Sequence, residues 1–137
     1  MTTFFCPSCW RVVAEDQPRC PACGCDIAAH LAGRTFTQRL VEALRHPEPE
    51  TPVRAAYILG LRGAREAVPE LLATASGTSD VYLAMACLDA LARIGGTQAR
   101  QGIRSLCADP RVRVANRAKE LLASGPGGPI DALREVP

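Results

Sequence analysis

Apolar residues recur at intervals of three and four positions from residue 35 to residue 124, and this spacing predicts a series of amphipathic helices. Short stretches with proline, glycine, serine or threonine separate the apolar segments, as is typical of helix ends and turns. The pattern divides into six helices, whose apolar faces contain Leu40, Ala56, Leu71, Leu88, Ile103 and Leu121. We therefore expect a mainly α-helical fold over most of the chain.

Capping signals place the ends of these helices. Thr35 and Gln38 have the three-residue spacing of a capping box, in which two side chains satisfy free amides at the helix start. Pro69 fits a helix only in its first turn, where a missing amide costs nothing, and Gly63 is a typical C-terminal cap. The predicted starts of the other helices are Thr51, Ser79, Thr97 and the pair Asp109-Pro110.

The helices also repeat one another along the chain. The spaced triplet Val53, Ala56 and Leu59 recurs with small residues in the same places from Val81, and once more from Val112. Equal apolar faces at a nearly fixed period indicate supersecondary units that bury their faces against one another. The sequence therefore predicts a short helical solenoid with two helices in each unit.

The N-terminal segment 1–27 carries a different signal, two Cys-x-x-Cys pairs. The pairs are Cys6 with Cys9 and Cys20 with Cys23. Each pair can present two thiolates from one tight turn, and four thiolates form the tetrahedral site that Zn²⁺ prefers. Because four cysteine ligands leave no open position for substrate, we expect a structural zinc ion, without which so short a block would not fold.

Between the pairs, Val12-Val13 predicts a short strand and residues 15–18 a turn. The block resembles the short CPxC…CPxCG zinc ribbons found at the ends of many bacterial proteins. Trp10 stands where such ribbons carry glycine, and a bulky residue there predicts a distorted first turn. Two interpretations of the fifth thiol, Cys25, stay open: it exchanges with Cys23 as a ligand, or it is a bystander.

The helical part has its own family resemblance. The stretches 52–56, 66–72 and 109–115 resemble the short HEAT-like repeats of bacterial scaffold proteins and phycobiliprotein lyases. The resemblance implies a HEAT-like α-solenoid in which the arginine of each Val-Arg pair braces neighbouring repeats. That role would belong to Arg54 and Arg113, although the middle repeat has Tyr82 at this position.

Together these signals divide the chain into four segments. They are a zinc ribbon at 1–27, a linker at 28–34, HEAT-like helical repeats at 35–124 and a flexible C-terminal tail at 125–137. Because the linker is short, the ribbon and the stretch after it are expected to cover the N-terminal end of the stack.

Composition and charge narrow the classes of function. The formal net charge of +2 is too small to require a nucleic-acid or membrane partner. The chain shows no signal peptide and no apolar run of the roughly 18 residues that a membrane span needs, so we expect a cytoplasmic protein without a membrane partner. Thiols stay reduced in that compartment, which favours metal binding over disulfides.

Patterns typical of catalysis are missing from the sequence. It contains no Gly-rich phosphate loop, zinc-protease motif or nucleophile elbow. Neither His30 nor His46 has a neighbouring Asp, Ser or Cys in a triad-like pattern, and Cys87 and Cys107 lie on apolar helix faces, where cysteine acts as a small hydrophobe. We therefore expect a non-catalytic adaptor whose partner is another protein.

Basic residues near the C-terminus support an alternative function. Four-residue spacing places Arg100 and Arg104 on one helix face, and Arg113 and Arg117 likewise, as a candidate partner-binding basic face. Such a face could bind an acidic protein or a phosphate backbone, so the alternative is a nucleic-acid-binding accessory protein. A bilin lyase-like enzyme follows from family analogy alone and ranks third.

Overall fold

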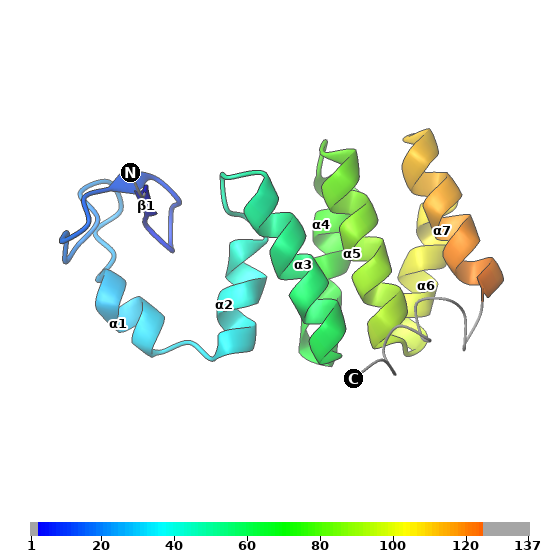
Figure 1. The fold of residues 1–137 in the computed structure, drawn as a ribbon, viewed down its shortest axis with the longest axis horizontal. Coiled ribbons are helices and arrows are strands. Elements are labelled where there is room, and N and C mark those ends of the chain that lie inside the picture. Colours follow the sequence, from blue (N-terminus) through cyan, green and yellow to red (C-terminus); the bar gives the residue numbers. More distant parts are fainter. Residues whose placement is uncertain (1–2, 125–137) are drawn as a thin grey trace.

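The computed structural model describes residues 3–124, so the predicted flexible tail at 125–137 lies outside the described residues. A small two-stranded ribbon stands at one end of a row of packed helices (Figure 1). The antiparallel strands of the ribbon are β1 (Phe4–Phe5) and β2 (Val12–Val13), with Phe4 opposite Val13 and Phe5 opposite Val12. The strand predicted at Val12-Val13 is thus confirmed.

The helices are α1 (Ile27–Ala32), α2 (Phe36–Ala43), α3 (Glu50–Arg62), α4 (Val68–Gly77), α5 (Val81–Ile94), α6 (Thr97–Leu106) and α7 (Val112–Ser124). A 3-10 turn, η1 (Arg65–Ala67), leads into α4. Helices α3, α5 and α7 lie side by side in one layer, and α4 and α6 form a second layer behind them (Figure 1). The short helix α1 begins at the last residue of the predicted ribbon segment and otherwise lies in the segment predicted as a linker.

One continuous apolar core joins α2 to α7. It begins at Leu40 in α2 and ends at Leu121 in α7, and Leu59, Leu71 and Leu88 are fully buried in it. Burying a leucine side chain contributes on the order of 1.5–3 kcal/mol, so these contacts dominate the stability of the stack. The predicted apolar faces are the faces that pack, which confirms the mainly α-helical fold.

Helices α3 and α5 pack closely because a glycine stands at their crossing. A Cβ atom at Gly60 would lie 2.9 Å from the Cα of Ala90, which is closer than real side chains approach a backbone. Gly60 therefore allows the two backbones to meet, at the cost of a weak helix former inside α3.

Several predicted helix ends are confirmed. The Thr35 hydroxyl accepts from the amide of Gln38 at 3.1 Å, and the Gln38 side chain accepts from the amide of Thr35 at 2.9 Å, which completes the capping box of α2. Gly63 ends α3 with a φ of 61°, a left-handed conformation that favours glycine. Pro69 lies in the first turn of α4.

The N-cap of α5 is Asp80, so the prediction of Ser79 is wrong. One oxygen of the Asp80 carboxylate accepts from the amides of Tyr82 at 2.9 Å and Leu83 at 3.3 Å. A carboxylate also carries the negative charge that the amino end of a helix favours, which a serine hydroxyl lacks.

Three other helix starts differ slightly from the predicted positions. Helix α3 begins at Glu50, before Thr51, without a side-chain cap. Thr97 is the first residue of α6 instead of its cap, which is Gly96. Helix α7 begins at Val112, after the Asp-Pro pair that was expected to open it.

Candidate metal centre and interaction surfaces

Each Cys-x-x-Cys pair of the ribbon forms a closed turn. In the first turn, the amide of Trp10 donates to the carbonyl of Cys6 at 2.8 Å, and the amide of Cys6 donates to the carbonyl of Arg11 at 2.9 Å. In the second turn, the amide of Gly24 donates to the carbonyl of Cys20, also at 2.8 Å. The two turns therefore share one hydrogen-bond pattern.

Trp10 takes the backbone conformation that glycine takes in the second turn. Its φ is 63°, compared with 77° for Gly24. A residue with a Cβ atom loses about 1–2 kcal/mol in this left-handed region. The expected distortion of the first turn is not observed, because its hydrogen bonds are intact and the strain lies in the backbone of Trp10.

The two turns bring four sulfur atoms together. The Sγ atoms of Cys6 and Cys23 are 3.6 Å apart, as are those of Cys9 and Cys20. All four Sγ atoms lie within 4.8 Å of one another. A tetrahedral Zn²⁺ with bonds of about 2.3 Å needs sulfurs about 3.8 Å apart, so this group fits such an ion. The four cysteines that the sequence spacing singled out could therefore hold one metal ion.

The surroundings shift the pKa values of these thiols in opposite directions. Hydrogen bonds from the amides of Cys23 and Ala22 lower the pKa of Cys20 to about 7, and the Ala22 nitrogen lies 3.4 Å from the Cys20 sulfur. Although the Arg11 amide opposes the effect, burial and the other three thiols raise the pKa of Cys9 to about 11. Metal ligation needs thiolates, and the charge of a bound divalent cation would stabilise them.

Cys25 is outside this group of sulfurs. Its carbonyl accepts from the amide of Cys20 at 2.9 Å, which is the bond that Arg11 makes with Cys6 in the first turn. Its backbone thus helps to close the second turn, while burial and the neighbouring thiols of Cys6 and Cys23 raise the pKa of the Cys25 thiol, so this thiol lies beside the group without being one of its four sulfurs.

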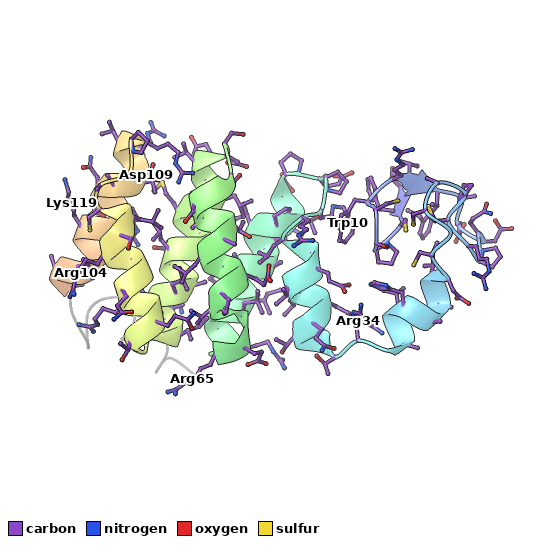
Figure 2. The ribbon with its side chains drawn as sticks, turned by 180° about the vertical axis from the view of Figure 1, so that it is seen from behind. Trp10, Arg34, Arg65, Arg104, Asp109 and Lys119 are labelled. Carbon is purple, nitrogen blue, oxygen red and sulfur yellow. The ribbon has the colours of Figure 1, made fainter. Side chains whose placement is uncertain are left out.

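An aromatic contact joins the ribbon to the helical stack. The ring of His46, just after α2, lies 4.7 Å from the ring of Phe5 and 5.0 Å from the ring of Trp10, measured between centroids. Trp10 is on the side of the ribbon that faces the stack (Figure 2). The sequence analysis did not identify this contact, although the aromatic residues beside the first cysteine pair were an available signal.

A carboxylate in α2 fixes the segment between the ribbon and the stack. The two oxygens of Glu42 accept from Arg34 at 2.6 Å and bind the His30 ring nitrogen at 2.9 Å. Although partial burial opposes it, Arg34 and His30 lower the pKa of Glu42. Arg39 also donates to the carbonyl of Leu31 at 2.7 Å, near the end of α1. The ribbon is thus placed at the N-terminal end of the stack, as the short linker predicted.

The four arginines of the predicted basic face are divided between the two helix layers. Arg100 and Arg104 are exposed on α6, whereas Arg113 is exposed on α7. Arg117, also on α7, is half-buried and donates to the carboxylate of Asp89 at 2.7 Å. Partner binding by these residues stays a prediction, and it applies best to the exposed pair on α6.

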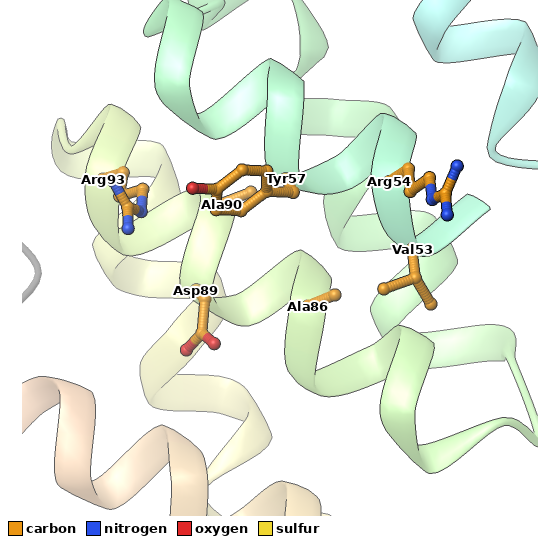
Figure 3. A pocket seen from close by; sticks show the side chains of 7 residues that line it. All are labelled: Val53, Arg54, Tyr57, Ala86, Asp89, Ala90 and Arg93. Carbon is orange, nitrogen blue, oxygen red and sulfur yellow. The ribbon is translucent and has the colours of Figure 1, made fainter. Parts of the chain in front are cut away.

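A groove lies between α3 and α5 (Figure 3), with a volume of about 250 Å³. We call it the α3–α5 groove. Its lining residues are Val53, Arg54 and Tyr57 from α3, and Ala86, Asp89, Ala90 and Arg93 from α5. The guanidinium carbon of Arg93 lies 5.6 Å from the centroid of the Tyr57 ring, within the range of a cation–π contact.

Comparison with known families agrees with this architecture. A family model of HEAT repeats matches residues 37–123, which extend from α2 to α7 and make up well over half of the chain. The chain belongs to the HEAT-repeat family. Comparisons with curated proteins and with solved structures gave no match. The predicted fold, HEAT-type helical repeats behind a small N-terminal cysteine cluster, is therefore confirmed.

The arginine that braces the HEAT repeats is Arg111. It donates to the carbonyls of Ala75 at 2.7 Å and Thr78 at 2.5 Å, at the end of α4. The carboxylate of Asp109 holds the same guanidinium through two hydrogen bonds of 2.7 and 2.8 Å. This fork ties the turn before α7 to the turn between α4 and α5.

The brace expected at Arg54 is therefore wrong, and Arg113 makes one long contact with the neighbouring repeat. The Arg54 side chain is 79% exposed, and its contact with Glu50 within α3 is 3.9 Å long. Arg113 is exposed and reaches the Tyr82 hydroxyl at 3.5 Å. Both residues lie in the first turn or two of a HEAT helix, where the side chain faces solvent, whereas a residue in the preceding loop can reach back to α4.

Proposed function

We propose that this chain is a non-catalytic protein–protein interaction adaptor, in which a short HEAT-repeat scaffold carries a structural zinc ribbon at its N-terminal end. The observation that carries the proposal is the HEAT stack itself, which covers residues 37–123. Stacked repeats present extended surfaces and use most of their buried groups for packing between units, which suits binding better than catalysis.

Zinc is the metal proposed for the cysteine cluster. Thiolate ligands select soft or borderline metals. The distance of 3.6 Å between the sulfurs of Cys6 and Cys23, and of Cys9 and Cys20, is close to that in a tetrahedral Zn²⁺ site. Four protein ligands fill its coordination sphere, so the ion would hold the two turns together without binding substrate.

The remaining thiols support a role without chemistry. Burial raises the pKa of Cys87 to about 12, so this thiol stays protonated and unreactive. Cys107 is partly buried against the core, and its sulfur lies 3.7 Å from the carbonyl of Ile103. Both cysteines thus act as packing residues.

A reducing compartment suits these thiols, and we propose the cytoplasm. The cysteine cluster needs free thiolates to bind metal, which oxidising compartments would convert to disulfides. None of the described helices has the length and apolar character that crossing a bilayer requires.

Affinity purification of the intact tagged chain, with nuclease present throughout, tests the adaptor function. A protein that copurifies in a fixed ratio to the chain and rebinds when purified separately would support it. If no protein copurifies, or if the copurifying proteins disappear with nuclease treatment, the proposal fails.

Nucleic-acid binding is the second candidate, and the exposure of Arg100 and Arg104 on α6 favours it. Phosphate contacts release counterions, so such binding would weaken steeply between about 50 and 200 mM salt. Fluorescence anisotropy with single-stranded RNA and duplex DNA measures this, and reversal of both charges, R100E with R104E, should abolish it. A nucleic-acid affinity that does not change with salt concentration, or that does not change in the double variant, would rule out this candidate.

A further inference from the structure

We propose that the α3–α5 groove binds a short acidic peptide segment of a partner protein. The segment would insert one apolar side chain beside Tyr57 and place a carboxylate near Arg54. The inference rests on the proposed adaptor function, and it names the surface that binds and the chemistry of what it binds.

Small side chains on α5 create the hollow of the groove. Ala86 and Ala90 form its floor, and the larger Val53 and Tyr57 of α3 stand beside them (Figure 3). The helices approach each other closely at Gly60, beside Ala90 in this floor. A volume of about 250 Å³ is below the roughly 300–1,000 Å³ typical of pockets for drug-sized ligands, so it suits one inserted side chain.

The walls of the groove have the composition of a binding hot spot. Tyr57 is 54% exposed, yet its ring is held in place because Arg93 lies over it. Tyrosine and arginine are both enriched in hot spots, and the tyrosine ring offers a large contact area at a low cost in side-chain entropy. Tyr82 on α5 and Val112 on α7, each 69% exposed, are further exposed side chains on helices of the same layer.

Charge complementarity decides the kind of partner. Among the described lining residues, the one carboxylate belongs to Asp89, which already accepts from Arg117 at 2.7 Å. Arg54 has a loose contact of 3.9 Å with Glu50, and such an exposed pair contributes little. The cations that line the apolar hollow are Arg54 and Arg93, and its one acid is already paired, which favours acidic peptides over basic ones.

Selection from a library tests the chemistry of the partner without assuming a sequence. Random dodecapeptides displayed on phage are selected against the intact chain, and the enriched peptides are synthesised with a fluorescent label. We expect one large apolar residue flanked by Asp or Glu in the enriched sequences. Enrichment of basic or uncharged peptides, or of none, would overturn the proposal.

Three variants then locate the binding surface by fluorescence anisotropy. Tyr57→Ala should weaken the peptide about tenfold or more, because it removes the wall against which the apolar side chain packs. Arg54→Glu, at a position exposed enough to leave folding intact, should weaken it about fivefold. The matched control, Arg100→Glu on α6, makes the same charge change in the other layer and should change affinity less than about twofold. Equal effects of the two charge reversals would contradict the proposal.

Other occupants of the groove would give distinct results. Tighter binding of a synthetic peptide of residues 125–137 than of any selected peptide would assign the groove to the chain's own tail. A dimer that Tyr57→Ala dissociates would assign it to a second copy, and either result overturns the proposal. If a purified protein partner binds Tyr57→Ala and Arg54→Glu as tightly as wild type, the adaptor function stands and the groove assignment falls.

Discussion

The ribbon and the helical stack differ in how much each buries. Among residues 3–26, the buried residues are Cys6, Pro7 and Cys20, and two of these belong to the cysteine cluster. In the stack, every helix from α2 to α7 contributes to one continuous apolar core. The stack therefore owes its stability to many small contributions, whereas the ribbon depends on one metal ion.

Because of this difference, a single substitution should have different consequences in the two regions. Losing one ligand removes most of the free energy that folds the ribbon, while losing one core side chain removes a fraction of what folds the stack. The regions meet through a small contact of His46 with Phe5 and Trp10 and through the ion pairs of Glu42. Each region should therefore tolerate damage to the other.

The largest expected effect comes from a cysteine ligand. Cys20→Ser should abolish tight metal binding and unfold the ribbon, because metal supplies on the order of 10 kcal/mol to such small sites. Native mass spectrometry gives the metal content, and NMR gives the state of the ribbon amides. The matched control Cys25→Ser should keep one metal ion per chain. Equal loss in both variants would show that Cys25 is a ligand.

A core substitution should damage the stack and leave the metal in place. Leu88 is fully buried, so Leu88→Ala should lower the free energy of unfolding of the stack by about 2–5 kcal/mol. Urea unfolding followed by far-ultraviolet circular dichroism measures this change. Leu61→Ala, at a residue 48% exposed on the same layer, is the control and should cost about 0.5 kcal/mol or less. A fall in metal content in Leu88→Ala would contradict the claim that the ribbon and the stack are stabilised independently.

Removing the brace between HEAT units should have a smaller effect. Arg111→Ala loses the hydrogen bonds to α4 and leaves the Asp109 carboxylate without its cation, so we expect a loss of about 2 kcal/mol. Arg113→Ala removes an exposed arginine from α7 and should cost about 0.5 kcal/mol or less. A lower urea midpoint for Arg113→Ala than for Arg111→Ala would instead support the brace at Arg113 that the family resemblance implied.

Acid should weaken the same brace. Arg111 lowers the pKa of Asp109 to about 2 in the folded chain, compared with about 4 when unfolded. A depressed folded pKa gives stability that is present above about pH 4 and lost as the pH falls towards about 2. Thermal melts of the intact chain at several pH values, followed by helix content, should show this loss of stability in acid. The loss should be smaller in Asp109→Asn. An unchanged acid profile in that variant would argue against the pair.

The smallest effect on stability is expected at the junction of the two regions. Trp10→Gly relieves the left-handed backbone but removes the ring that packs on His46, so the net change should stay within about 1 kcal/mol. The ribbon should keep its metal but tumble faster than the stack in NMR relaxation, and His46→Ala should do the same. Relaxation like that of wild type in both variants would show that the ribbon docks through other residues.

How much could be predicted from the sequence depended on how local each feature is. The spacing of the cysteines located the sulfur cluster, and the recurring triplet from Val53 located the stack, because both signals are periodic along the chain. The α5 cap was placed one position early, at Ser79, because neighbouring Ser79 and Asp80 both fit the rule and their geometry decides between them.

Contacts between distant segments could not be read from the pattern. Arg111 reaches carbonyls at the end of α4, with all of α5 and α6 between them in the sequence, and its sequence neighbours give no sign of that path. The contact of Trp10 with His46 depends on how the linker turns, which the helix α1 and the Glu42 ion pairs determine. The α3–α5 groove likewise exists because two repeats pack at Gly60.

Hydrogen exchange of the metal-loaded chain, before and after a strong chelator, tests the central claim that two regions are stabilised by separate means. We expect the amides of residues 3–26 to lose their protection when metal is removed, while those of α3 to α7 keep theirs. Unchanged protection in the ribbon would contradict the metal's role in folding it. Loss of protection in α5 or α7 would contradict the independence of the stack.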